Sequence, residues 1–90
     1  MSEIKIERPS QEKIDEMRIT DWSIWEKEES TFDWFYDSQE TCYILEGNAT
    51  VEPHDSDPVE FGPGDLVTFP KGMKCVWKIT KAIRKHYMFE

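Results

Sequence analysis

Polar and apolar side chains alternate along residues 3–7, which is the period of a half-exposed β-strand at a sheet edge. Trp22 and Ile24 show the same period of two and predict a second strand. Residues 31–36 continue with a run rich in aromatic side chains, which favour strands. The first part of the chain therefore predicts three short strands before residue 40.

A short helix is predicted between the first two of these strands. Residues 11–17 follow Ser10, a favoured N-cap residue, and carry acidic side chains in the first turns. Ile14 and Met17 stand three residues apart, so they share one face of this helix. We expect that face to cover the outside of the strands.

The next stretch, residues 40–45, is apolar on both faces of a predicted strand. One face is expected to look into the interior, and the other to be covered by another sheet or by a second subunit. This is the sequence's best indication of a homodimer. Gly47 and Asn48 then form a two-residue hairpin signal, with glycine first as in a type II′ turn, which leads into a strand at 49–52.

Two turns enclose a strand in the second half of the chain. Residues 62–65 are Gly-Pro-Gly-Asp and predict a tight turn, residues 66–69 form a short buried strand, and Pro70 ends it. The remaining segments are short strands at 59–61, 74–79 and 83–89, an exposed loop at 53–58 and a connection at 80–82.

Roughly eight or nine short strands separated by turns are typical of an all-β barrel. A chain of 90 residues suffices for one small core and not for two. We therefore predict a single domain, with a strand and a short helix in residues 1–21 and a β-barrel in residues 22–90.

Charge and hydropathy limit the partners of the chain. A formal net charge of −8 argues against nucleic acid and against an anionic membrane surface as partners. No apolar run is long enough to span a membrane, and the N-terminus does not show the order of a signal peptide. We expect a cytoplasmic protein whose two cysteines are free thiols.

Alternation along the strands indicates which side chains share an inward face. If Glu40 looks inward, Cys42 and Ile44 do so too, and if Cys75 looks inward, so does Trp77. A carboxylate on such an apolar face must be solvated, paired or protonated, because burying it alone is costly. Arg84 and Lys85 on the closing strand are candidate partners of Glu40 in a structural ion pair.

Two spacings in the chain resemble the motifs of the cupin superfamily. Gly64, Pro70, Gly72 and Cys75 follow the second motif, with cysteine where that motif has a histidine, and Glu40 precedes Gly47 as the glutamate of the first motif does. The resemblance implies a cupin (RmlC-like) jelly-roll barrel in which Glu40 and Cys75 line one cavity.

The likeness extends over most of residues 22–88 to small single-domain cupins, the group of the (S)-ureidoglycine aminohydrolase and ethanolamine-utilisation cupins. The group's pattern implies a metal held by three histidines and one glutamate, and of these positions only Glu40 is present. Asp33 and Phe35, or Trp34 and Tyr36, stand where a His-x-His pair would be. Fewer ligands than a stable first-row metal needs remain, so we predict neither a bound metal nor another cofactor.

The predicted site is an aromatic cavity that binds a small polar metabolite. Glu40 is assigned as acid/base or anchor and Cys75 as a second polar group, and both stand as the catalytic candidates. The ligand-binding candidates are Trp34, Tyr36, Trp77, Cys42 and His86.

Three other interpretations stay open at this stage. The aromatics can be core of a non-catalytic dimeric module. Glu40 and Cys75 can form a residual metal site, zinc being favoured by a thiolate, with aminohydrolase-like activity. Cys42 and Cys75 can carry thiol chemistry.

Overall fold

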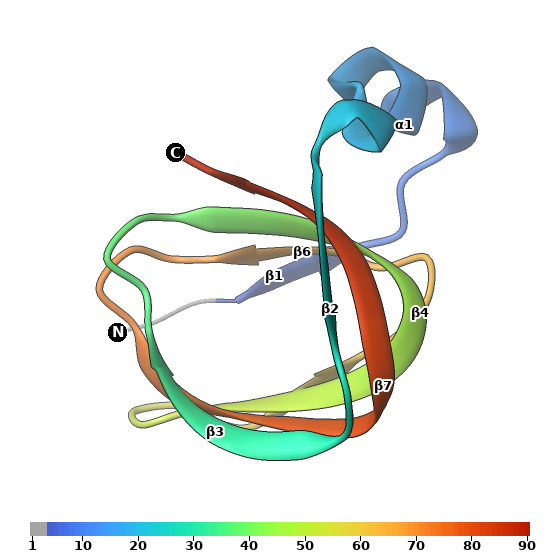
Figure 1. The fold of residues 1–90 in the computed structure, drawn as a ribbon. Coiled ribbons are helices and arrows are strands. Elements are labelled where there is room, and N and C mark those ends of the chain that lie inside the picture. The colour runs from blue at the N-terminus through green and yellow to red at the C-terminus, as the bar shows by residue number, and fades with distance from the viewer. Residues whose placement is uncertain (1–3) are drawn as a thin grey trace.

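Two long strands organise the structure, a computed structural model that describes residues 4–90. They are β4 (Glu40–Pro53) and β7 (Lys74–Phe89), which pair antiparallel from Glu40 opposite Phe89 to Pro53 opposite Cys75. Both strands curve through the molecule, so each contributes to the two layers seen in Figure 1. Inward side chains of both strands pack in one hydrophobic core.

The shorter strands attach to this pair in a sheet with the order β1-β6-β4-β7-β2, where β3 also pairs with β7 and β5 with β4. Their bounds are β1 Lys5–Glu7, β2 Ser23–Lys27, β3 Ser30–Phe35, β5 Val59–Phe61 and β6 Leu66–Phe69. The antiparallel pairings, with one short α-helix in residues 4–90, confirm the predicted all-β barrel. Residue 3 of the first predicted strand lies outside the described residues.

The predicted hairpin at Gly47 and Asn48 is wrong, because β4 continues through both residues. Register shifts against β7 occur between Ile44 and Ala49, so this point is a β-bulge and not a turn. Gly47 has a φ of 88°, and a Cβ atom there would collide with the carbonyl oxygen of Ala82. Glycine thus lets the bends of β4 and β7 pass each other closely.

The predicted connection at 80–82 is also wrong, since β7 runs without interruption from Lys74 to Phe89. Residues 80–82 are exposed, but they stay in strand conformation while the chain bends. β4 and β7 each replace two predicted strands, so residues 4–90 contain seven strands, fewer than predicted.

The N-terminal helix forms as predicted. It is α1 (Gln11–Met17), where the Ser10 hydroxyl accepts a hydrogen bond from the Lys13 backbone N–H at 3.2 Å, and a 3-10 turn, Ile19–Asp21, follows. Ile14 and Ile19 pack with Leu66 in a small second cluster that Tyr43 joins.

This cluster changes the account of the outer face of β4. The face was expected to meet another sheet or a second subunit, but Tyr43 packs against the helical segment instead. The apolar outer face of β4 therefore no longer supports a homodimer, which stays a prediction.

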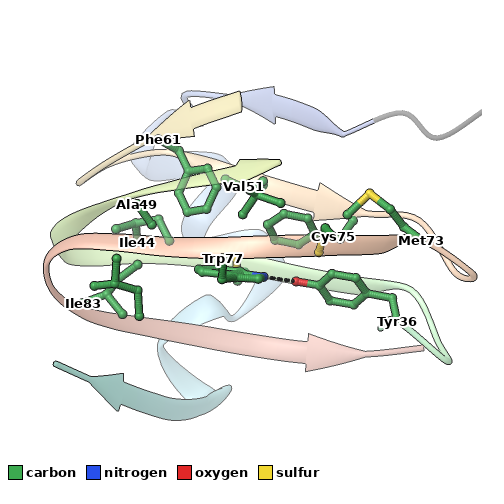
Figure 2. Packing of buried hydrophobic residues seen from close by; sticks show 13 residues of the cluster. Tyr36, Ile44, Ala49, Val51, Phe61, Met73, Cys75, Trp77 and Ile83 are labelled. Carbon is green, nitrogen blue, oxygen red and sulfur yellow. Dashed lines mark hydrogen bonds between the residues drawn. The ribbon is translucent and has the colours of Figure 1, made fainter. Parts of the chain in front are cut away.

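The predicted turn before β6 is confirmed. The Asp65 carboxylate accepts a hydrogen bond from the Gly62 N–H at 2.9 Å, and Gly64 has a φ of 90°. The main core cluster lies between the layers and includes Ile44, Val51, Phe61 and Trp77 (Figure 2). In residues 4–90, no helix has the length and apolar character needed to cross a lipid bilayer.

Candidate functional site

A cavity of about 210 Å³ opens on the inner face of the barrel. Seven aromatic side chains and one pair of opposite charges line it: Trp25, Phe32, Trp34, Tyr36, Trp77, Tyr87, Phe89, Glu40 and Lys85. Trp34 and Phe89 are 46% and 47% exposed, so they stand where the cavity meets solvent. The walls are thus apolar and the polar groups are few, as in ordinary small-molecule sites.

Glu40 and Lys85 form a buried ion pair in the wall of this cavity. Lys85 Nζ donates to Glu40 Oε2 at 2.8 Å, and the two side chains are only 6% and 4% exposed for Lys85 and Glu40. On paired strands Glu40 lies opposite Phe89, while Lys85 lies opposite Ile44, so the pair reaches diagonally along the sheet. One of the two partners that the sequence offered, Lys85, is therefore the partner of Glu40.

Aromatic rings complete the surroundings of the Lys85 ammonium. Its Nζ atom lies 4.9 Å from the ring centroid of Trp25 and 4.8 Å from that of Trp77. An ammonium over indole faces is attracted by the negative potential of the rings, more strongly where water is excluded. The cation is thus held by one carboxylate and two indoles.

Tyr36 supplies a further polar group. Its hydroxyl oxygen accepts a hydrogen bond from Trp77 Nε1 at 3.1 Å (Figure 2), and its ring stacks on Phe69 with centroids 4.9 Å apart. Burial, and then the nearby Glu40 carboxylate, raise the pKa of the Tyr36 hydroxyl far above its usual range. Tyr36 therefore keeps its proton.

Both cysteines are buried free thiols behind the cavity wall and do not line the cavity. Burial raises the pKa of Cys42 to about 12, and burial together with Glu40 raises the pKa of Cys75 to about 11. The Cys75 thiol lies 3.7 Å from the Trp34 carbonyl oxygen, to which it donates weakly. Protonated, buried thiols are poor nucleophiles and poor metal ligands.

His86 also lies outside the cavity. Its neighbours Lys85 and Tyr87 on β7 point inward, so alternation turns His86 to the outer face, where its Nδ1 lies 3.1 Å from the Trp22 carbonyl oxygen. Of the predicted site residues, the cavity thus brings together Trp34, Tyr36, Trp77 and Glu40, and it leaves out Cys42, Cys75 and His86. Their predicted roles stay predictions.

Several lining residues were not assigned to the site from the sequence. Lys85 was considered only as a structural partner, and Trp25, Phe32, Tyr87 and Phe89 were not placed in a cavity. The signal was present in β7, where odd-numbered positions on both sides of the exposed bend at 80–82 share the inward face once the strand is read as continuous.

The side chains around Glu40 do not fit a divalent metal ion. The charged group nearest to its carboxylate is an ammonium, and the two thiols nearby are held protonated. Among residues 4–90, no three His, Cys, Asp or Glu side chains gather closely enough to hold a metal. The polar groups of the residues that line this cavity are thus one carboxylate, one ammonium, the phenols of Tyr36 and Tyr87, and the indole N–H groups of its tryptophans.

Known structures share this fold. A crystal structure of a DUF861 family protein from Thermotoga maritima is 52% identical, with a TM-score of 0.96 over 98% of this chain and 100% of that chain. The Clostridium difficile EutQ protein is 29% identical, with a TM-score of 0.67 over 73% of this chain and 52% of that chain. A mutant of Bacillus subtilis oxalate decarboxylase, 14% identical, matches with a TM-score of 0.59 over 98% of this chain and 25% of that chain, which concerns the fold alone.

A comparison with curated proteins gave no match. The family model of the EutQ-like cupin domain matches residues 15–87, which include nearly all of the barrel and, apart from Phe89, every residue that lines the cavity. The barrel is therefore a cupin barrel, and the chain belongs to the EutQ-like cupin family.

Proposed function

We propose that the aromatic cavity binds a small polar metabolite, with Glu40 as its anchor. The observation that carries this proposal is the buried ion pair of Glu40 and Lys85, 2.8 Å apart, in the wall of a cavity that is otherwise aromatic. A reducing, cytoplasmic setting belongs to the proposal, because both thiols are free.

The energetics of the pair support a role beyond stability. Taking two charges out of water costs several kcal/mol for each, and well-packed apolar residues in their place often stabilise a protein equally or better. The position of the pair adds to this, since both side chains line a cavity and not the closed core around Val51 and Phe61. A buried charged pair beside an open cavity is well placed to orient a polar ligand.

A thermal-shift screen tests the proposal. Wild-type protein is melted with a library of small metabolites, and a ligand of the folded state raises the melting temperature by mass action. The shift should disappear in Glu40→Gln and persist in Glu52→Gln. Glu52 is a matched control, because it lies on the same strand and pairs with Lys78 at 3.0 Å on the surface.

The other interpretations predict different results. In a non-catalytic module whose cavity is only core, no metabolite shifts the melting temperature and Glu40→Gln changes stability alone. An aminohydrolase-like activity through a Glu40 and Cys75 metal site has less support, because the Cys75 thiol is protonated and lies outside the cavity. A catalytic role of Glu40 toward the bound metabolite is compatible with the proposal and needs the ligand first.

A further inference from the structure

The ion pair in the cavity limits the charge that a ligand can carry. The indole faces of Trp25 and Trp77 already hold the Lys85 ammonium, and this ammonium repels a second cation that enters the cavity. An anion would face the Glu40 carboxylate, and the ammonium that could bind it is already satisfied by Glu40 and the rings. An added charge would stay uncompensated in an apolar cavity, which is costly. These contacts favour a neutral ligand.

Glu40 and Tyr36 offer that ligand groups of opposite hydrogen-bonding character, with Tyr87 as a further phenol in the lining. Within residues 4–90, Glu40 Oε1 has no hydrogen bond, whereas Oε2 accepts from Lys85. No side-chain nitrogen or oxygen of this part of the chain is both fully buried and without a partner, so Oε1 keeps some exposure. Because Glu40 lines the cavity, we assign this exposure to the cavity side, where Oε1 can accept a hydrogen bond. Tyr36 can donate, because its oxygen already accepts from Trp77 and its proton is retained.

The size and walls of the cavity select a flat ring. An apolar cavity of about 150 Å³ holds one benzene molecule, so a cavity of about 210 Å³ has room for one ring with a small substituent. The Trp77 and Phe32 rings both line the cavity and lie within 6° of parallel. These two rings stack on each other and form one flat aromatic layer in the wall, and a cavity walled by flat rings favours a planar molecule.

From charge, hydrogen bonding and shape together, we infer that the cavity takes a neutral, planar ring compound with a hydrogen-bond donor beside an acceptor, as in an aromatic carboxamide. The donor N–H bonds to Glu40 Oε1, the acceptor oxygen bonds to the Tyr36 hydroxyl, and the ring lies among the aromatic side chains of the cavity wall. This inference rests on the proposed function and narrows its ligand to one chemical class.

Four probes of one shape test the inference: benzamide, benzoate, benzylammonium and toluene. They share the ring and differ in charge and in hydrogen bonding. Titration calorimetry on wild-type protein should give benzamide a Kd at least about tenfold lower than each of the others, the effect of one or two buried hydrogen bonds.

Tyr36→Phe keeps the ring and removes the hydroxyl, which is the donor to the ligand and also the acceptor of the Trp77 Nε1–H. It should weaken benzamide binding by about tenfold and leave toluene binding unchanged. Tyr43→Phe is the matched control, because Tyr43 lies on the outer face beneath the helix, and it should leave both affinities unchanged. Unchanged benzamide binding in Tyr36→Phe would overturn the assigned donor.

The results separate this inference from the proposed function. Tighter binding of benzoate or of benzylammonium would overturn the neutral class, while a metabolite pocket anchored at Glu40 would stand. Absence of binding by all four probes, with library metabolites still raising the melting temperature, would overturn the inference alone. Absence of any shift or binding would overturn both.

Discussion

Lys85 neutralises Glu40, the carboxylate that lines the cavity. Lys85→Ala leaves Glu40 buried without a partner and should cost about 3–5 kcal/mol of unfolding free energy. Propylammonium replaces the missing atoms of the side chain, so it should bind between Glu40 and the indoles and restore part of the melting temperature. Differential scanning calorimetry of the variant with increasing propylammonium measures the effect.

Two comparisons control this rescue. Propanol has a similar shape and no charge, and it should restore little or nothing. In the double variant Glu40→Gln, Lys85→Ala the carboxylate is absent, so propylammonium should lose its effect. Equal rescue by propanol and propylammonium would mean that the site needs volume and not a cation.

The buried thiols predict a loss of stability at alkaline pH. The pKa of Cys42 is raised from 9.0 to about 12 and that of Cys75 from 9.0 to about 11, so the folded state holds both protons more tightly than the unfolded chain does. This contribution is complete below about pH 9 and is lost as pH rises toward 11 and 12. Each thiol adds a slope of about 1.4 kcal/mol per pH unit in that window.

Urea unfolding at a series of pH values measures this slope. Cys42→Ala should reduce the pH dependence of the unfolding free energy between pH 9 and 11 by about 1.4 kcal/mol per pH unit, the contribution of one thiol. This holds whatever the substitution does to stability at pH 7. A variant with the wild-type slope would show that Cys42 does not titrate as its burial predicts.

At the scale of the elements, the bend where β4 passes β7 is the most demanding point of the fold. Gly47 and Gly72 have nearly equal φ values of 88° and 89°, but only at Gly47 would a Cβ atom meet the backbone of Ala82. Gly72→Ala should therefore cost about 1 kcal/mol of unfolding free energy from its φ alone. Gly47→Ala should cost about 2–3 kcal/mol more, because the two strands must separate.

Chemical denaturation of both variants compares the two glycines directly. Equal losses of unfolding free energy would show that the close approach of β4 and β7 contributes nothing beyond the strain of a positive φ. A much larger loss in Gly47→Ala would support the bulge as a structural requirement.

The same bend explains what could be predicted from the sequence. Turns at residues 62–65 and strands such as β5 and β6 were predicted because their signals are local. Gly47 and residues 80–82 carry the local signals of turns, yet pairing of β4 with β7 over their length keeps both in one strand each. Long-range pairing overrides local propensity, and a single sequence does not show it.

The prediction of the candidate site also depended on local signals and on long-range strand pairing. Alternation within short strands, which is local, indicated which residues share a face with Glu40 and with Cys75, and the resemblance to cupin motifs implied one cavity; Trp34, Tyr36, Glu40 and Trp77 do line it. Lys85 and His86 were not resolved, because a supposed connection at 80–82 interrupted the count along β7. Trp25 was missed since Trp22 and Ile24 were taken to define the apolar alternation of β2, whereas Ile24 is 45% exposed.

At the scale of the whole molecule, the cavity and the helical cluster lie on opposite sides of the sheet. Tryptophans lie on both sides: Trp25, Trp34 and Trp77 line the cavity, while Trp22 packs against the helical cluster that contains Ile19. A ligand in the cavity should therefore disturb three indoles and spare the fourth. This gives the molecule an internal control for the location of binding.

The most direct test of a ligand-binding cavity is a ¹⁵N-¹H correlation spectrum of the four indole N–H groups, recorded while a metabolite that raises the melting temperature is titrated. Binding in the cavity should shift the Trp77 signal most, because its N–H donates to Tyr36, with smaller shifts for Trp25 and Trp34 and none for Trp22. A titration that moves Trp22 and leaves Trp77 unchanged would contradict binding between Glu40 and the aromatic walls.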